Sequence, residues 1–228
     1  FRTVLTLLGI IIGVAAVVAM LAVGEGSRQK VLDRISAFGT NLMLVRPGGA
    51  GIRNAGDIAT LVPEDAAAIK ALPNIETALP ERSGRMTVRY RNMDYQTSVQ
   101  GTGADFPSAR DWKVAEGQFF NVDDMKLYSP VVVLGRTVAK ALFPDGGSPV
   151  GQYVLLRNVP FLVIGVMTEK GASPNGNDQD DVIFVPINTG MIRLFGKNYL
   201  SSITIKVRDA SDIDTTQERV ETLIKARH

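Results

Sequence analysis

The chain has 228 residues with nearly balanced charge, 25 basic against 23 acidic, and 45% of its residues are hydrophobic. This length suits one large domain or two small ones with a sizeable core, and the dispersed basic residues argue against nucleic acid as a partner. Cysteine is absent and the only histidine is His228, which excludes a disulfide framework and a cysteine nucleophile and argues against a His-rich metal site or a Ser/His/Asp triad.

A long uncharged segment lies at the start of the chain. Residues 4–23 carry no charge, and Thr6 is their only polar side chain. A helix of this length rises about 30 Å, the thickness of the hydrocarbon core of a bilayer, so we predict a transmembrane helix within residues 1–24. A cleaved signal peptide and a buried soluble helix are the alternatives, although a signal core is shorter, at about 7–15 residues. Because the first residue is Phe1, we expect the chain to be a piece of a longer protein.

Small residues recur on one side of this predicted helix. Gly9 and Gly13 form a GxxxG pattern, and Ala16 falls close to the same face. Such residues allow a second membrane helix to approach closely, so these three are candidate helix-packing positions, with chance occurrence as the alternative. Basic residues stand on both sides of the span, at Arg2 and at Arg28, so the positive-inside rule does not assign its orientation.

The helical pattern is predicted to continue beyond the membrane. Residues 25–39 contain no proline and end at Gly39, a candidate C-cap. Their apolar residues recur at helical spacing, and the candidate stalk-face residues are Val31, Leu32, Ile35 and Phe38. One helix over residues 5–38 would be about 50 Å long. We therefore expect a stalk helix over 25–39 that stands out from the bilayer.

Strands and short helices are mixed over the rest of the chain, which predicts an α+β fold. Alternating polar and apolar residues, or short apolar runs, predict strands at 41–45, 86–90, 95–99, 131–134, 152–157, 161–166, 182–185 and 203–207. Start and stop signals predict helices at 63–72, 137–143 and 188–195, and a last helix capped by Ser211 or Asp212. Two hairpins are predicted, with loops at 92–94 and 158–160, and a polar loop at 171–181.

The pattern of strands, helices and loops changes along the chain, and we predict two lobes. One lobe is discontinuous and consists of residues 40–105 and 186–228. The other, over residues 106–185, is inserted into the first. Trp112, Phe119 and Phe120 are expected to anchor the core of this inserted part rather than to stack on a ligand.

The sequence contains no convincing catalytic or cofactor-binding motif. Residues 190–198 resemble a phosphate-binding loop, but the spacing of their glycines is wrong and a hydroxyl residue is missing, so Gly196 is predicted to end a helix instead. Asp178, Asp180 and Asp181 lack the spacing of a calcium loop, and a solvated loop is the preferred interpretation. We therefore predict no enzymatic activity and no metal or cofactor site within this chain.

Three segments resemble one family of membrane transport proteins. Residues 8–31, LGIIIGVAAVVAMLAVGEGSRQKV, resemble the first transmembrane helix and stalk of MacB-type ABC permeases, the macrolide-exporter group of the FtsX-like permeases. Residues 132–167 and the motif DQDDVIFVP at 178–186 are similar to the extracytoplasmic domain of that family. The resemblance covers nearly the whole chain, and its glycine, proline and apolar motifs are specific in combination.

The resemblance implies an architecture and a set of partners. Subunits of this family have four transmembrane helices, with a large periplasmic domain between the first and second, and work as a homodimer in the bacterial inner membrane. The domain has a porter-like discontinuous lobe and a small inserted α/β lobe. ATP and Mg²⁺ would bind an ATP-binding domain or subunit outside this chain. A periplasmic adaptor protein would connect the domain to a TolC-like duct in the outer membrane.

The resemblance also implies mechanotransmission, in which closure of the dimer on ATP binding is carried outward through the stalk to drive efflux and, with it, antibiotic resistance. Three alternatives stay open at this point. The first is a lipoprotein-release or cell-division type permease of the same plan. The second is a single-helix membrane-anchored binding or sensor module, and the third is an anchored enzyme. The sequence does not identify a transported substrate.

Overall fold

The computed structural model describes most of the chain after residue 40 and a few positions before it, namely residues 13–15, 17, 20, 41–48, 61–173 and 176–228. The chain divides into two compact units, residues 1–40 and 41–228. The second unit mixes helices with a sheet of nine strands, so the predicted α+β class is confirmed.

The described positions of the first unit are helical. They are Gly13, Val14, Ala15, Val17 and Met20. Within the part of the chain that the structure describes, no helix is both long and apolar enough to cross a bilayer. The rest of the predicted span and the whole predicted stalk lie outside the described residues.

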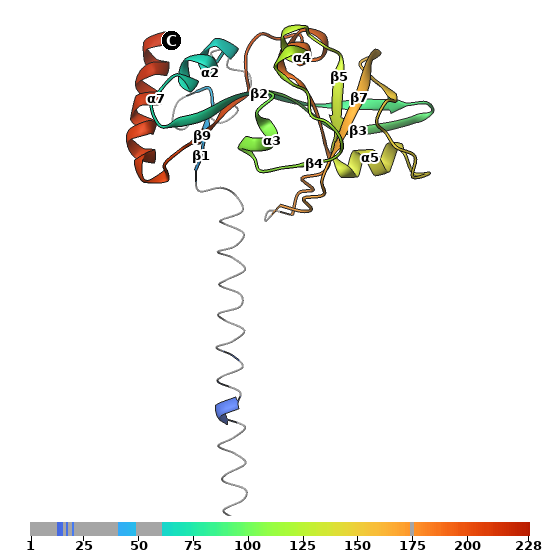
Figure 1. Ribbon diagram of the computed structural model, residues 1–228, viewed down its shortest axis with the longest axis horizontal. Coiled ribbons are helices and arrows are strands. Elements are labelled where there is room, and N and C mark those ends of the chain that lie inside the picture. Colours follow the sequence, from blue (N-terminus) through green and yellow to red (C-terminus); the bar gives the residue numbers. More distant parts are fainter. Residues whose placement is uncertain (1–12, 16, 18–19, 21–40, 49–60, 174–175) are drawn as a thin grey trace, which may run out of the picture. The chain divides into compact units, whose positions relative to one another are not determined.

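One end of the second unit is an antiparallel sheet with two helices packed on it (Figure 1). β1 (Leu42–Val45) pairs with β9 (Ser202–Val207), and β9 pairs with the first half of β2 (Ile75–Tyr90). α2 (Pro63–Lys70) and α7 (Ile213–Arg227) pack against this sheet. The residues that fill the core between them are aliphatic, among them Leu61, Ile69, Ile75, Ile187, Leu200, Ile203, Ile205, Val207 and Val220.

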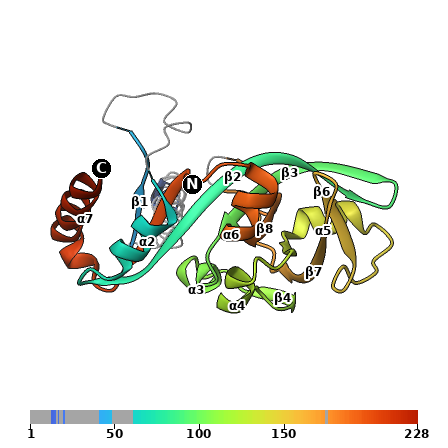
Figure 2. The same ribbon diagram turned by 90° about the horizontal axis from the view of Figure 1, so that it is seen from above.

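The second half of β2 belongs to a closed ring of strands (Figure 2). The pairings run β2–β3–β8–β5–β7–β6 and return to β2 through Val88 opposite Leu156. The bounds of the other strands are β3 Met93–Thr102, β5 Val131–Leu134, β6 Tyr153–Leu156, β7 Val159–Met167 and β8 Val182–Pro186. Because alternate side chains of a strand point to opposite faces, the ring has an inner and an outer set of residues.

The two faces of the ring contribute to two different cores. The inner residues pack together with α5 (Arg136–Leu142), and they include Met86, Val88, Val99, Leu134, Val154, Leu156, Phe161, Val163 and Ile183. The outer face of β5, β7 and β8 lies under α3 (Phe106–Ala109) and α4 (Val122–Lys126), and β4 (Val114–Gly117) pairs with the end of β7. This second core is rich in aromatic rings, and its members include Phe106, Trp112, Phe120, Val133, Met167 and Phe184.

β2 changes sheets at Glu81 and Arg82. Residues up to Glu81 pair with β9, and residues from Arg82 onward pair with β3. The buried Glu81 carboxylate accepts a hydrogen bond from Thr204 Oγ1 at 2.9 Å and lies 3.6 Å from Arg110 Nη2. Arg82 Nη1 donates to the Tyr199 carbonyl at 3.1 Å. A buried polar network thus marks the point where β2 passes from the open sheet into the ring.

The predicted lobe boundaries, 40–105 with 186–228 and 106–185, stay a prediction. The ring takes strands from both predicted lobes, because β2 and β3 pair with β6 and β8. The contacts as a whole place residues 41–228 in one compact unit.

Both predicted hairpin loops are wrong in length. The loop predicted at 92–94 is a two-residue turn at 91–92, and the loop predicted at 158–160 is a two-residue turn at 157–158. Arg157 and Asn158 have φ angles of 48° and 64°. Two successive positive φ angles give the turn whose twist matches that of the flanking strands, so the shorter loop is the better fit to a hairpin.

The helix predicted at 188–195 is present as two continuous parts. α6 (Ile187–Gly190) is followed by the π-helical turn η2 (Met191–Phe195). Gly196 ends this turn with a φ of 61°, as predicted for a residue that must adopt the left-handed conformation. The predicted strands at 41–45, 131–134, 182–185 and 203–207 correspond to β1, β5, β8 and β9.

Asp212, one of the two predicted caps, is the N-cap residue of α7, although its side chain makes no capping hydrogen bond. A side-chain cap is made one turn earlier, where Asp209 accepts the N–H of Ser211 at 2.9 Å. A short 3₁₀ turn, η3 (Ala210–Asp212), then leads directly into α7. Because Asp209 precedes the 3₁₀ turn, its carboxylate can accept a backbone N–H at the start of the turn that has no partner within it.

Candidate interaction site around the loop before β8

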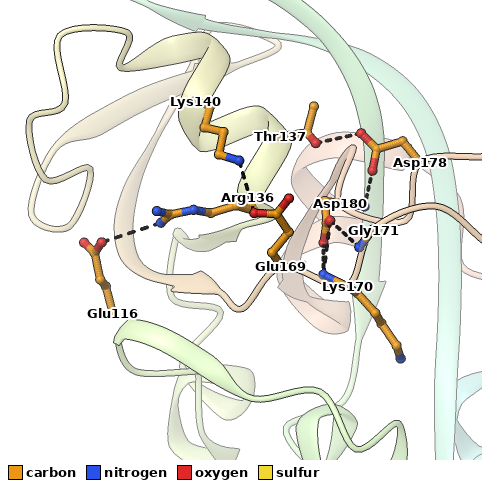
Figure 3. Close-up of polar contacts among 9 residues, drawn as sticks. All are labelled: Glu116, Arg136, Thr137, Lys140, Glu169, Lys170, Gly171, Asp178 and Asp180. Atoms are coloured by element: carbon orange, nitrogen blue, oxygen red, sulfur yellow. Dashed lines mark hydrogen bonds and ion pairs between the residues drawn. The ribbon is translucent and has the colours of Figure 1, made fainter. Parts of the chain in front are cut away.

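The described residues of the segment between β7 and β8, 168–173 and 176–181, lie against α5 and include most of the polar loop predicted at 171–181 (Figure 3). Asp180 closes the base of this loop. Its side chain is buried, with 2% of the residue exposed. Its carboxylate accepts the backbone N–H of Lys170 at 3.0 Å and that of Gly171 at 2.7 Å. Gly171 makes this turn possible because its φ of 79° is rarely adopted by residues with a side chain.

Two further contacts attach the loop to α5. Thr137 Oγ1 donates to Asp178 Oδ2 at 2.6 Å, and the same carboxylate accepts the N–H of Asp180 at 2.8 Å. Lys140 Nζ forms an ion pair with Glu169 Oε2 at 3.1 Å. This pair is well exposed, so it contributes less than about 1 kcal/mol. The Thr137 bond therefore carries most of the attachment to α5, while Asp180 closes the base of the loop.

The start of α5 is packed directly on the backbone of the loop. A Cβ on Gly135 would lie 2.3 Å from the Asp180 carbonyl oxygen and 2.6 Å from that of Val182. Gly135 instead donates its N–H to Val182 at 2.8 Å. On the other side of the helix, Arg136 Nη1 lies 3.7 Å from Glu116 Oε1 of β4. The loop, α5 and β4 thus form one contiguous surface.

Lys170 extends from the loop towards the aromatic core. Its Nζ lies 5.0 Å from the centre of the Trp112 ring and donates to the Arg110 carbonyl at 3.4 Å. Burial lowers the pKa of the Lys170 ammonium, and the nearby Arg110 charge lowers it further, while Asp111 and Asp180 act in the opposite direction. The ammonium is therefore held in place by packing on the ring as much as by its charge.

The acidic side chains of this site are engaged within the protein. The carboxylates of Asp178 and Asp180 already accept hydrogen bonds from the protein. Across the described ranges, no group of three or more His, Cys, Asp or Glu side chains is arranged to hold a metal ion. A polar loop that is fixed at both ends presents its exposed groups at low entropic cost to a partner.

The residues singled out as helix-packing and stalk-face candidates fall almost entirely outside this description. Gly13 alone is described; it is helical, and an added Cβ would meet nothing within 4 Å. Gly9 and Ala16 lie outside the described residues, as do the stalk-face candidates Val31, Leu32, Ile35 and Phe38. Helix packing and the stalk face therefore stay predictions.

Sequence reasoning missed one buried carboxylate, Asp65 of α2. It is fully buried, accepts the Val62 N–H at 2.9 Å and Arg227 Nε at 2.7 Å, and lies 2.8 Å from His228 Nε2. This cluster joins the start of α2 to the end of α7. The sequence indicated Asp65 only as an acid in the first turn of a helix, and no local pattern connects it with residues so far along the chain.

Comparison with known proteins places the whole chain in one family. Residues 3–223 match the family described as MacB-like periplasmic core domain. The chain is 52% identical over 229 residues to the Macrolide export ATP-binding/permease protein MacB of Rhodospirillum rubrum, and 53% identical over 228 residues to the protein of that name in Azoarcus sp.. Each alignment covers 100% of this chain but 35% of the relative, so the chain spans about a third of the length of these relatives.

The fold agrees with the sequence comparison. The crystal structure of the periplasmic region of MacB from Actinobacillus actinomycetemcomitans matches with a TM-score of 0.73 at 26% sequence identity. The match covers 86% of this chain and 90% of that structure. By both sequence and fold, the chain belongs to the family of MacB-like periplasmic core domains.

Proposed function

We propose that the chain is the first membrane helix and periplasmic domain of an ABC-type export permease in the bacterial inner membrane. The observation that carries this proposal is the identity of 52–53% across 100% of the chain to relatives named as macrolide export ATP-binding/permease proteins. Identity at this level over a whole domain favours a shared role. The remaining two thirds or so of such a protein would supply the other membrane helices and the ATPase.

The proposed permease works with several partners. It forms a homodimer, and ATP and Mg²⁺ bind an ATP-binding domain or subunit outside this chain. A periplasmic adaptor protein links the domain to a TolC-like duct in the outer membrane. The chain itself takes no cofactor in this proposal.

The proposed mechanism is mechanotransmission. ATP binding closes the dimer on the cytoplasmic side, and the predicted stalk over 25–39 carries this movement to the periplasmic domain. The loop that precedes β8 is our candidate for the adaptor contact, because it is polar, is bonded to α5 through Asp178 and is closed at its base by Asp180. A rigid loop can transmit a displacement of the domain to the adaptor, whereas a flexible loop would absorb the displacement.

The test is photocrosslinking in intact Gram-negative cells that express the full-length protein. A photoreactive residue is scanned through exposed positions of 106–185, including Glu169 and Asp178, and a control probe is placed at Arg219 on α7. The proposal predicts a crosslink from the loop to a periplasmic adaptor that survives detergent extraction. The control position should give none.

Other partners would redirect the assignment. Crosslinks only to lipoproteins or to a cell-wall hydrolase would replace export with the lipoprotein-release or cell-division reading. No partner at any scanned position would leave a membrane-anchored module and contradict the tripartite pump.

A further inference from the structure

About half of the outer face of the strand ring, called the bare face below, is not covered by any other helix or strand among the described residues. The outer face of β5, β7 and β8 is covered by the aromatic core, but β2, β3 and β6 have no element packed on their outer face within the described part of the chain. Register places Arg85, Thr87 and Arg89 of β2 on this side, and all three are exposed. Their neighbours Met86 and Val88 face inward and are buried.

The bare face contains a hollow whose cations are all arginines. Its volume is about 300 Å³, and its lining residues include Arg85, Arg89, Arg157, Asp94 and Leu155. Leu155 sits opposite Arg89 in the β2–β6 pairing and forms part of an apolar floor. Arg157 comes from the tight β6–β7 turn, whose φ angles of 48° and 64° fix the direction in which it leaves the sheet. The arginines therefore come from rigid elements.

The charges of this face are not balanced within the described chain. Arg89 is already engaged, because its Nε and Nη2 hold both oxygens of Asp94 at 2.5 and 2.6 Å. Arg85 has its closest carboxylate, Asp181, only at 4.0 Å, and its side chain is 69% exposed. Among the residues described, no acidic side chain lies within ion-pair distance of Arg157. The Arg157 guanidinium, and that of Arg85 with only this long contact, thus remain available beside Leu155.

We infer that this face, defined by Arg85, Thr87, Arg89, Leu155 and Arg157, docks a carboxylate-bearing segment of a different protein chain. Charge complementarity identifies the occupant, since guanidinium forks bind carboxylates in pairs of hydrogen bonds, as Arg89 does with Asp94. Arginine is enriched and lysine depleted at protein interfaces, and the lining contains no lysine. This inference stands on the charge of the face and not on the export function.

A second copy of the chain fits this face poorly. A two-fold interface centred here would bring the same patch of both copies together, and so would place Arg85 and Arg157 against their own equivalents. Like charges placed opposite one another across an interface repel and disfavour association. The acidic segment must therefore come from elsewhere than this face.

The test places a photoreactive residue at Thr87 in the full-length protein, in cells. We expect a crosslink to a protein segment that carries Asp or Glu side chains. Charge reversal by Arg85→Glu with Arg157→Glu should lower the crosslinking yield by roughly tenfold or more. Charges at an interface control both the rate of association and the rate of dissociation of the complex. Replacing the identified acidic residues of the partner by Lys should restore the yield with the reversed face. Arg208→Glu with Arg219→Glu makes the same charge change on an exposed surface elsewhere and should leave the yield unaltered.

Several results would overturn the inference. A yield that is insensitive to Arg85→Glu with Arg157→Glu would exclude charge recognition. Adducts to lipid alone would assign the face to anionic headgroups, and adducts to a second copy alone would assign it to self-association. The absence of any adduct at Thr87 would leave the face without a partner. Because both arginines are exposed, Trp112 fluorescence of each variant should match that of the unmodified protein.

Discussion

Replacing Asp180 by alanine should open the base of the loop that precedes β8 without unfolding the ring. The buried carboxylate is the only group that accepts the N–H groups of both Lys170 and Gly171 in the described structure. Alanine removes the acceptor and leaves these two donors at the base of the loop. The Thr137–Asp178 bond on the loop remains, so the substitution isolates the contribution of one carboxylate.

The expected change in the free energy of loop opening follows from the loss of two charge-assisted hydrogen bonds. Each is worth about 1.5–3 kcal/mol, and the lower value applies because water can reach the partly exposed Gly171 once the loop opens. Two bonds at the lower value give about 3 kcal/mol. At about 1.4 kcal/mol per factor of ten, the closed loop should lose roughly two orders of magnitude in its population relative to the open loop.

Hydrogen exchange read by mass spectrometry measures this loss directly. Amides of peptides covering 168–173 should exchange on the order of 100-fold faster in Asp180→Ala, in keeping with local opening that costs about 3 kcal/mol less. Peptides of β5 and β8 should keep their protection. Asp145→Ala, which removes an exposed carboxylate, is the matched control. Unchanged exchange at 168–173 in Asp180→Ala would refute the view that Asp180 fixes the loop.

Two further predictions concern stability, and urea unfolding followed by fluorescence of the single tryptophan, Trp112, checks both. Burial raises the pKa of Asp65, but hydrogen bonds from a backbone N–H and from the end of α7 outweigh burial and hold the pKa below its usual range. A lowered pKa stabilises the fold above the unfolded value of about 3.9, and this stability is lost as pH falls through the folded pKa. Asp65→Asn should therefore be less stable at pH 7 and lose less stability on acidification than the unmodified protein, and equal pH dependence would contradict this. Gly135→Ala should cost about 1–3 kcal/mol, because its Cβ would meet the carbonyl oxygens of Asp180 and Val182 at 2.3 and 2.6 Å; an unchanged unfolding midpoint would show that the contact is looser than described.

Elements with strong local signals were predictable to within a few residues. The run at 131–134 is apolar and lies between Pro130 and Gly135, and it forms the fully buried β5. Pro63 and the acids that follow it start α2, as their fit to the helix dipole and to the first turn requires. Such signals are contained in a few consecutive residues and do not depend on the rest of the fold.

The ring and the length of β2 could not be predicted in this way. Only 86–90 alternates cleanly, whereas Glu81 and Arg82 interrupt the apolar pattern earlier in the same strand. These two residues are buried because Thr204 and Tyr199, far along the chain, supply their partners. Closure of the ring depends on the pairing of Val88 with Leu156, which is equally non-local.

The candidate site was predictable by location but not by structure. Composition indicated a polar loop at 171–181, and the described residues of that range, 171–173 and 176–181, contain no helix or named strand. The sequence assigned Asp180 to a solvated loop, yet it is buried and accepts two backbone N–H groups ten or so residues earlier. Nothing in the residues next to Asp180 distinguishes it from the exposed Asp178.

The measurement that tests the central claim most directly compares ATPase activity with export in the full-length permease and its ATP-binding component. Ile35→Pro, or a short Gly/Ser insertion at Gln29, would interrupt the predicted stalk, since proline inside a helix costs about 3 kcal/mol and kinks it. Ile35→Leu is the control and should keep both activities. Mechanotransmission predicts that either interruption leaves ATP hydrolysis in place and abolishes export. Normal export by either variant would contradict the account.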